Sequence, residues 1–241
     1  MFKGETKVAI NVANENIAQN ISSVSTKKIK DVLVEGKLYR FIKRIIDVIG
    51  AIVGIITLVP LIAGIAIAKV ILNDKGPIMY THNRIGKDGK IFKMYKFRSM
   101  VVGADEILEK YLAENEEARE EYRINKKLKD DPRITKIGKF IRKTSLDEFP
   151  QFINVLKGDM TLVGPRPYLP REIDDMGEYY PYIVALKPGL TGYWQVNGRS
   201  DVDFNERLLM DMEYIKDRNL WLDIKLIIKT VVKVFRRKGA I

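Results

Sequence analysis

The sequence contains no cysteine and a single histidine, His82. Disulfide bonds and thiolate-bound metals are therefore excluded, and a zinc site or a serine–histidine triad is disfavoured. We expect His82 to lie on the surface or in a loop. Acidic residues are fewer than basic ones: the sequence has 31 Asp and Glu and 42 Lys and Arg, so its formal net charge is +11. Such a charge favours anionic partners: nucleic acid, phosphorylated substrates or an anionic lipid surface.

The first 36 residues lack the long apolar core of a secretory signal peptide. We expect 1–36 to form a largely disordered tail, with one short amphipathic helix near 27–34. The 241 residues are enough for one domain with a sizeable core, and this length does not exclude a division into two domains.

From 48 to 68 the chain carries no charged residue. A helix of this length covers about 30 Å, the hydrocarbon thickness of a bilayer. Pro60 lies near the middle and interrupts the helical hydrogen bonds. Because both flanks are basic, a spanning helix would place one basic cluster outside, against the positive-inside tendency. We therefore expect a re-entrant helix over 37–75 that bends at Pro60, in preference to a spanning helix or a buried core helix. The flanking cations are Lys37, Arg40, Lys43 and Arg44 before the run and Lys69 and Lys75 after it.

A carboxylate, Asp47, borders this run on its N-terminal side. Lys43 and Arg44 lie one helical turn before it, so we expect one of them to neutralise its charge.

Turn signals and periodicity predict the remaining elements. Asp88-Gly89 indicates a β-hairpin whose second strand covers 91–97. The basic residues near it are interpreted mostly as solvated or headgroup-facing surface: Arg84, Lys93, Lys96 and Arg98. Helices are expected within 104–129, at 134–141, at 149–156, at 204–215 and at 222–235. The last has an apolar face, a lysine stripe and Trp221 at its start, which favours a helix lying in the membrane surface over a packed helix. The aromatic cluster 179–182 fits either a headgroup-level anchor or ordinary core.

These elements predict an α+β, mainly helical, monotopic membrane protein. It would consist of the re-entrant helix, interfacial amphipathic helices and a small β-hairpin. The cytoplasmic catalytic domain would cover 76–241.

The stretch 144–151 carries the most chemistry, because it places Asp147 and Glu148 side by side just after Arg142. One carboxylate can attack or accept a proton while the other holds a divalent cation. Nearby cations keep both ionised and can neutralise phosphoryl oxygens. The alternative is structural, since Ser145-x-x-Glu148 also fits a capping box at a helix start.

A second candidate segment brackets an arginine between two prolines, Pro165-Arg166-Pro167. The prolines fix the backbone on either side of the guanidinium. Such a loop can clamp a phosphate or hold a carboxylate in register. A rigid surface loop without chemistry is the alternative.

Six segments in fixed order carry a family resemblance. They are Lys-Phe-Arg-Ser-Met at 96–100, Ser-Leu-Asp-Glu-x-Pro-Gln at 145–151, Asn-Val-Leu-Lys-Gly-Asp-Met at 154–160, Val-Gly-Pro-Arg-Pro at 163–167, Lys-Pro-Gly-Leu-Thr-Gly at 187–192 and Gln-Val-Asn-Gly-Arg at 195–199. Together they resemble the bacterial sugar transferases, the monotopic polyprenyl-phosphate phosphoglycosyl transferases. The similarity covers the chain from about Leu38 onward. Larger members carry spanning helices before this region, so we expect the minimal catalytic form.

The resemblance implies a reaction in which a UDP-sugar gives its sugar-1-phosphate to a polyprenyl phosphate, such as undecaprenyl phosphate, and UMP is released. It implies that Asp147 is the nucleophile of a covalent aspartyl intermediate, that Glu148 binds Mg²⁺, and that Arg142 assists phosphate binding. Pro165-Arg166-Pro167 matches the family's loop beside the active site. Arg199 and its neighbours are candidates for nucleotide or phosphate contacts. Many members kink the membrane helix at Ser-Pro, whereas here Val59 precedes Pro60.

Two other functions stay open at this point. A glycosyltransferase that moves only the sugar would release UDP in place of UMP. A membrane-attached basic adaptor would explain the charge of +11 but would leave the acidic pair without a role. No aromatic–basic nucleic-acid motif is evident, so we expect no nucleic-acid partner. The identity of the sugar and the formation of a homo-oligomer are left open.

Overall fold

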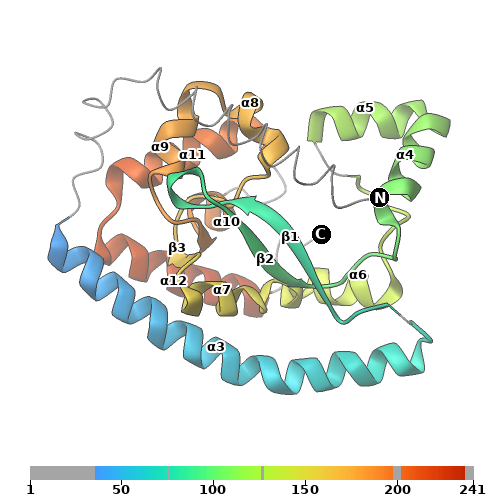
Figure 1. Cartoon of the computed structure of the whole chain (residues 1–241), viewed down its shortest axis with the longest axis horizontal. Helices are drawn as coiled ribbons and strands as arrows, with labels where there is room; N and C mark the ends of the chain where they lie inside the picture. Colours follow the sequence, from blue (N-terminus) through green and yellow to red (C-terminus); the bar gives the residue numbers. More distant parts are fainter. Residues whose placement is uncertain (1–35, 75, 126–127, 198–201, 237–241) are drawn as a thin grey trace.

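The computed structural model describes residues 36–74, 76–125, 128–197 and 202–236. Helices dominate these residues and two small sheets accompany them, which confirms the predicted mainly helical class (Figure 1). The tail expected over 1–36 lies, apart from Gly36, outside the described residues. The elements are α3 (Lys37–Ile71), β1 (Met79–Ile85), η1 (Lys87–Gly89), β2 (Ile91–Phe97), α4 (Ala104–Glu114), α5 (Glu116–Asn125), α6 (Lys136–Lys143), η2 (Leu146–Glu148), α7 (Gln151–Lys157), β3 (Thr161–Val163), η3 (Pro170–Glu172), α8 (Ile173–Met176), η4 (Gly177–Tyr179), α9 (Tyr180–Val184), β4 (Gly189–Thr191), α10 (Tyr193–Asn197), α11 (Phe204–Asp217) and α12 (Leu220–Arg236).

The apolar stretch forms one continuous helix, α3, of 35 residues, which curves along one side of the molecule (Figure 1). The expected bent-back hairpin is therefore replaced by a single curved helix that keeps Pro60 inside it. Thr57 donates its hydroxyl to the carbonyl of Gly54 at 2.8 Å. Such a bond and the missing proline N–H both bend helices without ending them.

The inner face of α3 packs on the rest of the protein along most of its length. Ala51, Leu58 and Ile65 are buried on this face. Gly54 lets α7 approach, because a Cβ at this position would lie 2.3 Å from the ring of Phe152. Each fully buried aliphatic side chain contributes about 1.5–3 kcal/mol, so this face stabilises the continuous course of α3 along the protein.

Both ends of α3 are held by ion pairs to the same globular body. Near its start, Lys43 pairs with Asp223 of α12 at 2.7 Å. At its end, Lys69 pairs at 2.9 Å with Asp74, which also pairs with Arg98 after β2. The two termini of the helix therefore lie on one body.

The outer face of α3 is apolar and exposed. Within the described part of the chain, α3 is the one helix long and apolar enough to cross a membrane, and only 22% of its most apolar stretch is buried. The core-helix alternative does not fit this exposure. The exposed large apolar side chains of α3 are Leu38, Phe41, Ile45, Ile49, Ile52, Val53, Ile56, Val59, Ile67, Val70 and Ile71.

The predicted hairpin is confirmed, with β1 and β2 antiparallel and Ile85 opposite Ile91. Its turn needs left-handed backbone at Asp88 (φ 57°) and Gly89 (φ 74°), which aspartate tolerates and glycine adopts freely. His82 lies on β1, not in the expected loop, and faces Met94 of β2 in the register.

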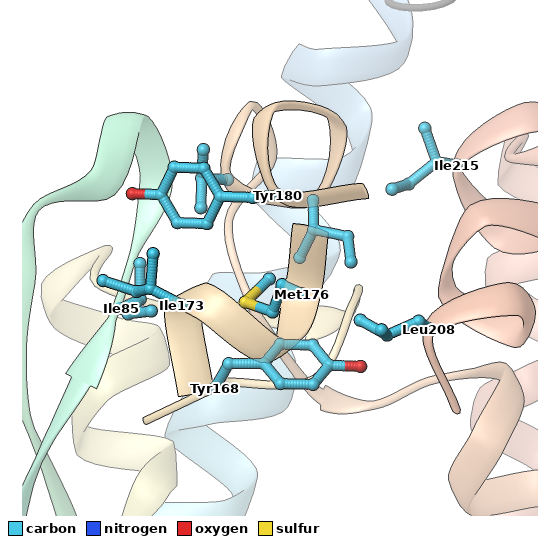
Figure 2. Packing of buried hydrophobic residues seen from close by; sticks show 9 residues of the cluster. Ile85, Tyr168, Ile173, Met176, Tyr180, Leu208 and Ile215 are labelled. Carbon is cyan, nitrogen blue, oxygen red and sulfur yellow. The ribbon is translucent and has the colours of Figure 1, made fainter. Parts of the chain in front are cut away.

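A main core cluster joins the end of β1, Tyr168, α8, α9 and α11 (Figure 2). Tyr180 is completely buried in it, which places the aromatic cluster 179–182 in the core. A second cluster, with Val155, Met160 and Leu226, joins α3, α7 and α12. Between them β3 and β4 form a short parallel pair that leads directly into the segment 164–167.

Candidate active site

The acidic pair lies in a tight turn between α6 and α7. Thr135 caps the start of α6 by accepting the N–H of Gly138 at 2.9 Å. At the other end, Ser145 adopts left-handed backbone (φ 57°) and its side chain makes no capping hydrogen bond. The capping-box interpretation is therefore wrong, because the chain reverses at Ser145 before a short 3-10 turn. This turn presents Asp147 and Glu148 beside one another.

Both carboxylates line a large cavity, with a volume of about 1230 Å³. Strand β2, helix α6, the acidic turn, segment 164–167 and α10 all contribute to its wall. The sequence-predicted residues Arg142, Asp147, Glu148 and Arg166 all line it. The further basic residues in its wall are Arg84, Lys96, Arg98, Arg133, Arg171 and Arg207. The cavity is therefore suited to an anionic ligand of considerable size.

Lys96 links the two carboxylates. Its Nζ lies 2.9 Å from Glu148 Oε1 and 3.8 Å from Asp147 Oδ2. The interpretation of Lys96 as solvated surface is wrong, since 26% of its side chain is exposed and it points at the acidic pair. Sequence spacing gave no signal, because the partners are 52 positions apart.

Asp147 is mostly buried, with 15% of its side chain exposed. Burial raises its pKa above the ordinary value, and the negative charge of Glu148 adds to this. Lys96 and Arg142 oppose the shift because they stabilise the carboxylate form. Ionised Asp147, the form that can attack phosphorus, therefore depends on these two cations.

Arg142 is oriented by a hydroxyl. Its Nε donates to Ser99 Oγ at 2.8 Å, and Ser99 lies in the segment that follows β2. Gly138 of α6 packs so tightly on Ser99 that a Cβ would lie 1.9 Å from its carbonyl oxygen. Ser99 is thus fixed against α6, and the Nη groups of Arg142 have no hydrogen-bond partner among the described residues.

The loop Pro165-Arg166-Pro167 is held from both sides. Gly189 donates its N–H to the carbonyl of Pro165 at 2.8 Å. On the other side, Arg84 donates to the carbonyl of Pro167 at 3.0 Å. Burial and the nearby charge of Arg166 lower the pKa of Arg84 to about 10, so it stays a cation at neutral pH. The carbonyl groups of both prolines therefore accept hydrogen bonds, and Arg166 lines the large cavity.

An indole lies between two guanidinium groups in this part of the wall. Trp194 of α10 has the Arg166 guanidinium 5.2 Å and the Arg207 guanidinium 5.8 Å from its ring. Such cation–π contacts contribute about 0.5–2 kcal/mol each. Trp194 and Arg207 were not predicted as site residues, because they come from two helices whose adjacency no sequence pattern shows.

Few of the described side chains are placed to act as metal ligands. The described residues contain no group of three or more Asp, Glu, His or Cys side chains placed to hold an ion. Mg²⁺ commonly takes one or two carboxylates and completes its shell with phosphates and water. Asp147 and Glu148 fit that form, since 42% of the Glu148 side chain is exposed. Lys96 is close enough to Glu148 to compete with the ion.

One predicted site residue, Arg199, lies outside the described residues. Pro60 lies within α3 and does not line the cavity.

Comparison with known proteins identifies the family. Residues 38–237 match the family model described as bacterial sugar transferase. The chain belongs to the bacterial sugar transferases. It is 48% identical over 201 residues to an undecaprenyl-phosphate galactose phosphotransferase of Salmonella typhimurium, a match that covers 83% of this chain and 42% of that protein. The exopolysaccharide production protein ExoY of Sinorhizobium fredii is 39% identical over 198 residues, with 82% of this chain and 87% of that protein covered.

A third bacterial sugar transferase relative is the UDP-glucose:undecaprenyl-phosphate glucose-1-phosphate transferase of Escherichia coli. It is 39% identical over 209 residues, which cover 83% of this chain and 42% of that protein. The chain thus spans less than half the length of several of these transferases. The shared part is the one that carries the acidic pair and the Arg166 loop.

Proposed function

We propose that this chain transfers a sugar-1-phosphate from a UDP-sugar to undecaprenyl phosphate, giving a polyprenyl diphosphate sugar and UMP. The observation that carries the proposal is the Asp147–Glu148 pair, held by Lys96 in a large cationic cavity of a bacterial sugar transferase. Two relatives named for undecaprenyl phosphate support the acceptor. The name of ExoY, an exopolysaccharide production protein, supports a place in exopolysaccharide production. Within it we assign this chain to the first membrane step of exopolysaccharide, capsule or related glycan assembly.

The proposed chemistry has two steps at one phosphorus atom. A carboxylate oxygen of Asp147 bonds to the sugar-bearing phosphorus, and the bond from that phosphorus to the bridging oxygen of UMP breaks. UMP leaves with the electron pair, and the phosphosugar stays on Asp147. A phosphate oxygen of undecaprenyl phosphate then attacks the same phosphorus. The bond to Asp147 breaks and its carboxylate is restored.

The chain's own cations support both steps. Lys96 stabilises the ionised form of Asp147, and Arg142, held at Nε by Ser99, directs its Nη groups to phosphate oxygens. Arg166 offers a second guanidinium on a rigid loop. When bound, Mg²⁺ would be held by Glu148 and would neutralise charge on the diphosphate.

The proposal includes attachment to the cytoplasmic face of the cell membrane. Both ends of α3 are tied to one body, by the Lys43–Asp223 pair at its start and by the pair of Asp74 with Arg98 at its end. Placing the two ends on opposite sides of a bilayer would break one of these ion pairs. The exposed apolar face of α3 and the exposed Trp221, Ile228 and Val231 of α12 support insertion into one leaflet. A polyprenyl acceptor would then be reached from the membrane plane.

The activity test is a panel of UDP-sugars with undecaprenyl phosphate, with the released nucleotide identified. We expect acceptor-dependent UMP release with at least one of UDP-glucose, UDP-galactose and the N-acetylated UDP-aminosugars. Release of UDP would indicate a glycosyltransferase. Absence of any nucleotide release across the panel, with folded protein, would contradict the proposal.

The topology test uses the absence of cysteine from the chain. Single variants Leu38→Cys and Leu72→Cys place one thiol near each end of α3, where both side chains are exposed. We expect an impermeant maleimide to reach both thiols from the cytoplasmic side only. Labelling of either thiol from the outside would overturn the one-leaflet placement.

A further inference from the structure

The loop Pro165-Arg166-Pro167 has a single backbone N–H, that of Arg166, because proline carries none. This N–H donates to Asp211 Oδ2 at 3.0 Å. The hydroxyl of Tyr168 donates to the same oxygen at 2.9 Å. Figure 2 shows the Tyr168 hydroxyl directed toward α11, beside Leu208. The Asp211 carboxylate, on α11, therefore accepts hydrogen bonds from the only backbone donor of the loop and from the side chain of Tyr168, which follows the loop.

We propose that the Asp211 carboxylate is a positioning residue that sets the placement of Arg166 for the phosphosugar transfer proposed above, on which this inference rests. Asp211 is completely buried and does not line the large cavity. It therefore acts through Arg166 and not through contact with a substrate.

The remaining contacts of the loop do not replace the hydrogen bond to Asp211. Its flanks are fixed by backbone hydrogen bonds from Gly189 to Pro165 and by the Arg84 side chain on Pro167. The Arg166 side chain meets Trp194 at 5.2 Å and lies 4.0 Å from a carboxylate oxygen of Glu172. The Gly189 bond holds the carbonyl oxygen of the Pro165–Arg166 peptide unit, and Asp211 accepts the N–H at the other end of the same unit. Among the contacts of the loop between described residues, only the bond to Asp211 uses that N–H.

A contribution to the stability of the fold does not explain why a charged residue is buried at position 211. Its Oδ1 has no hydrogen-bond partner among the described residues, and no ion pair compensates the carboxylate there. Burial raises its pKa to about 7, although the Arg166 N–H, the Tyr168 hydroxyl and the Arg166 charge oppose the shift. Asparagine would present the same acceptor oxygen without a buried charge. What only the carboxylate supplies is a negative charge beside Arg166.

The discriminating variant is Asp211→Asn, with stability and turnover measured on the same preparation. At pH 8 we expect unfolding at the same or a higher temperature than wild type. Asparagine keeps the acceptor oxygen, so the change removes only the negative charge that attracts Arg166. We expect kcat for UMP release to fall about 10- to 100-fold, the scale of a misplaced catalytic group, with a smaller change in KM. A structural role alone would move stability and activity in the same direction. Asp217→Asn, the same change on an exposed residue of the same helix, is the matched control and should change neither.

A second readout does not require turnover. The chain has two tryptophans, so Trp221→Phe leaves Trp194, which lies under Arg166, as the only emitter. In that background we expect Asp211→Asn to shift the emission of Trp194 and to increase its quenching by acrylamide. Tyr168→Phe removes one donor to Asp211 and should give a smaller shift in the same direction.

The outcomes separate the two proposals. If wild type releases no nucleotide with any donor, the proposed function fails, and the emission of Trp194 alone decides the placement of Arg166. If wild type is active and Asp211→Asn matches it in kcat and emission, the positioning role is overturned. Loss of kcat together with a large fall in unfolding temperature would also overturn it, because Asp211 would then be an ordinary structural residue.

Discussion

The Nζ of Lys43 lies 2.7 Å from Asp223 Oδ2, and this pair joins the start of α3 to the start of α12. The same Nζ donates to the carbonyl of Val163 at 2.8 Å, and the hydroxyl of Tyr214 donates to the other oxygen of Asp223 at 2.8 Å. Val163 ends the strand that leads into the Arg166 loop. The apolar helix and the candidate active site are therefore parts of one hydrogen-bonded network.

Removing one charge of this network should be costly. In Asp223→Asn the ammonium of Lys43 keeps its position but loses its counter-charge, while 17% of the Lys43 side chain is exposed. Breaking a buried pair typically costs about 3–5 kcal/mol, and partial exposure places this pair toward the lower end. Thermal unfolding in detergent measures the effect. Glu120→Gln, which breaks the exposed pair with Arg123, is the control and should leave unfolding unchanged. If Asp223→Asn and Glu120→Gln had equal effects on unfolding, the Lys43–Asp223 pair would not have the stabilising role given to it here.

Lys96→Met should shift the pH dependence of activity. Burial already raises the pKa of Asp147, and Lys96 is the leading influence that lowers it. Without that charge the pKa rises further, so the acidic limb of kcat/KM should move to higher pH. We also expect a loss of about 100-fold at neutral pH. Lys96→Arg, which keeps the charge, should retain the position of the limb. If the acidic limb of the pH profile does not move in Lys96→Met, then Lys96 does not lower the pKa of Asp147.

Ser99 should affect activity through Arg142. Ser99→Ala removes the acceptor of the Arg142 Nε, a hydrogen bond to a charged group worth about 1.5–3 kcal/mol. We expect kcat/KM to fall about tenfold. Ser99→Thr keeps the hydroxyl and should restore most of the activity. Equal activity of the alanine and threonine variants would show that the hydroxyl does not orient Arg142.

Asp211 also predicts a dependence of stability on pH. Its pKa is about 7 in the folded protein and near 3.8 ordinarily, so the folded state binds the proton more tightly. Its contribution is therefore fully present below pH ~4 and is lost as pH rises through 7, by an amount on the order of a few kcal/mol. Wild type should lose stability relative to Asp211→Asn between pH 5 and pH 8. Parallel stability curves would mean that Asp211 does not titrate in this range.

Local signals predicted the local elements well. The Asp88-Gly89 turn, the strand 91–97 and the helices α6, α11 and α12 follow from turn chemistry and periodicity. The parallel pair β3 and β4 was not predicted, because each strand has three residues and shows no period.

Features that depend on distant partners could not be predicted. Asp47 was expected to pair with Lys43 or Arg44, but it accepts the Thr161 hydroxyl at 2.8 Å and the Leu162 N–H at 2.8 Å. An i, i+4 rule holds only when no other partner lies closer. The continuous course of α3 has the same origin, because contacts with α7 and β3 outweigh the local effect of a proline.

The residues of the candidate site also fall into those that local sequence predicted and those that it did not. Asp147, Glu148, Arg142 and Arg166 stand in contiguous motifs and were predicted. Lys96, Trp194 and Arg207 reach the cavity from elements whose adjacency exists only in the fold.

The most direct test of the account is intact-mass analysis of the protein incubated with its UDP-sugar and without acceptor. The account predicts an added mass of one phosphosugar, located on Asp147 by peptide mapping, absent in Asp147→Asn and discharged when undecaprenyl phosphate is added. A protein that turns over with acceptor, yet never carries this adduct on Asp147 under rapid acid quench, would contradict the account.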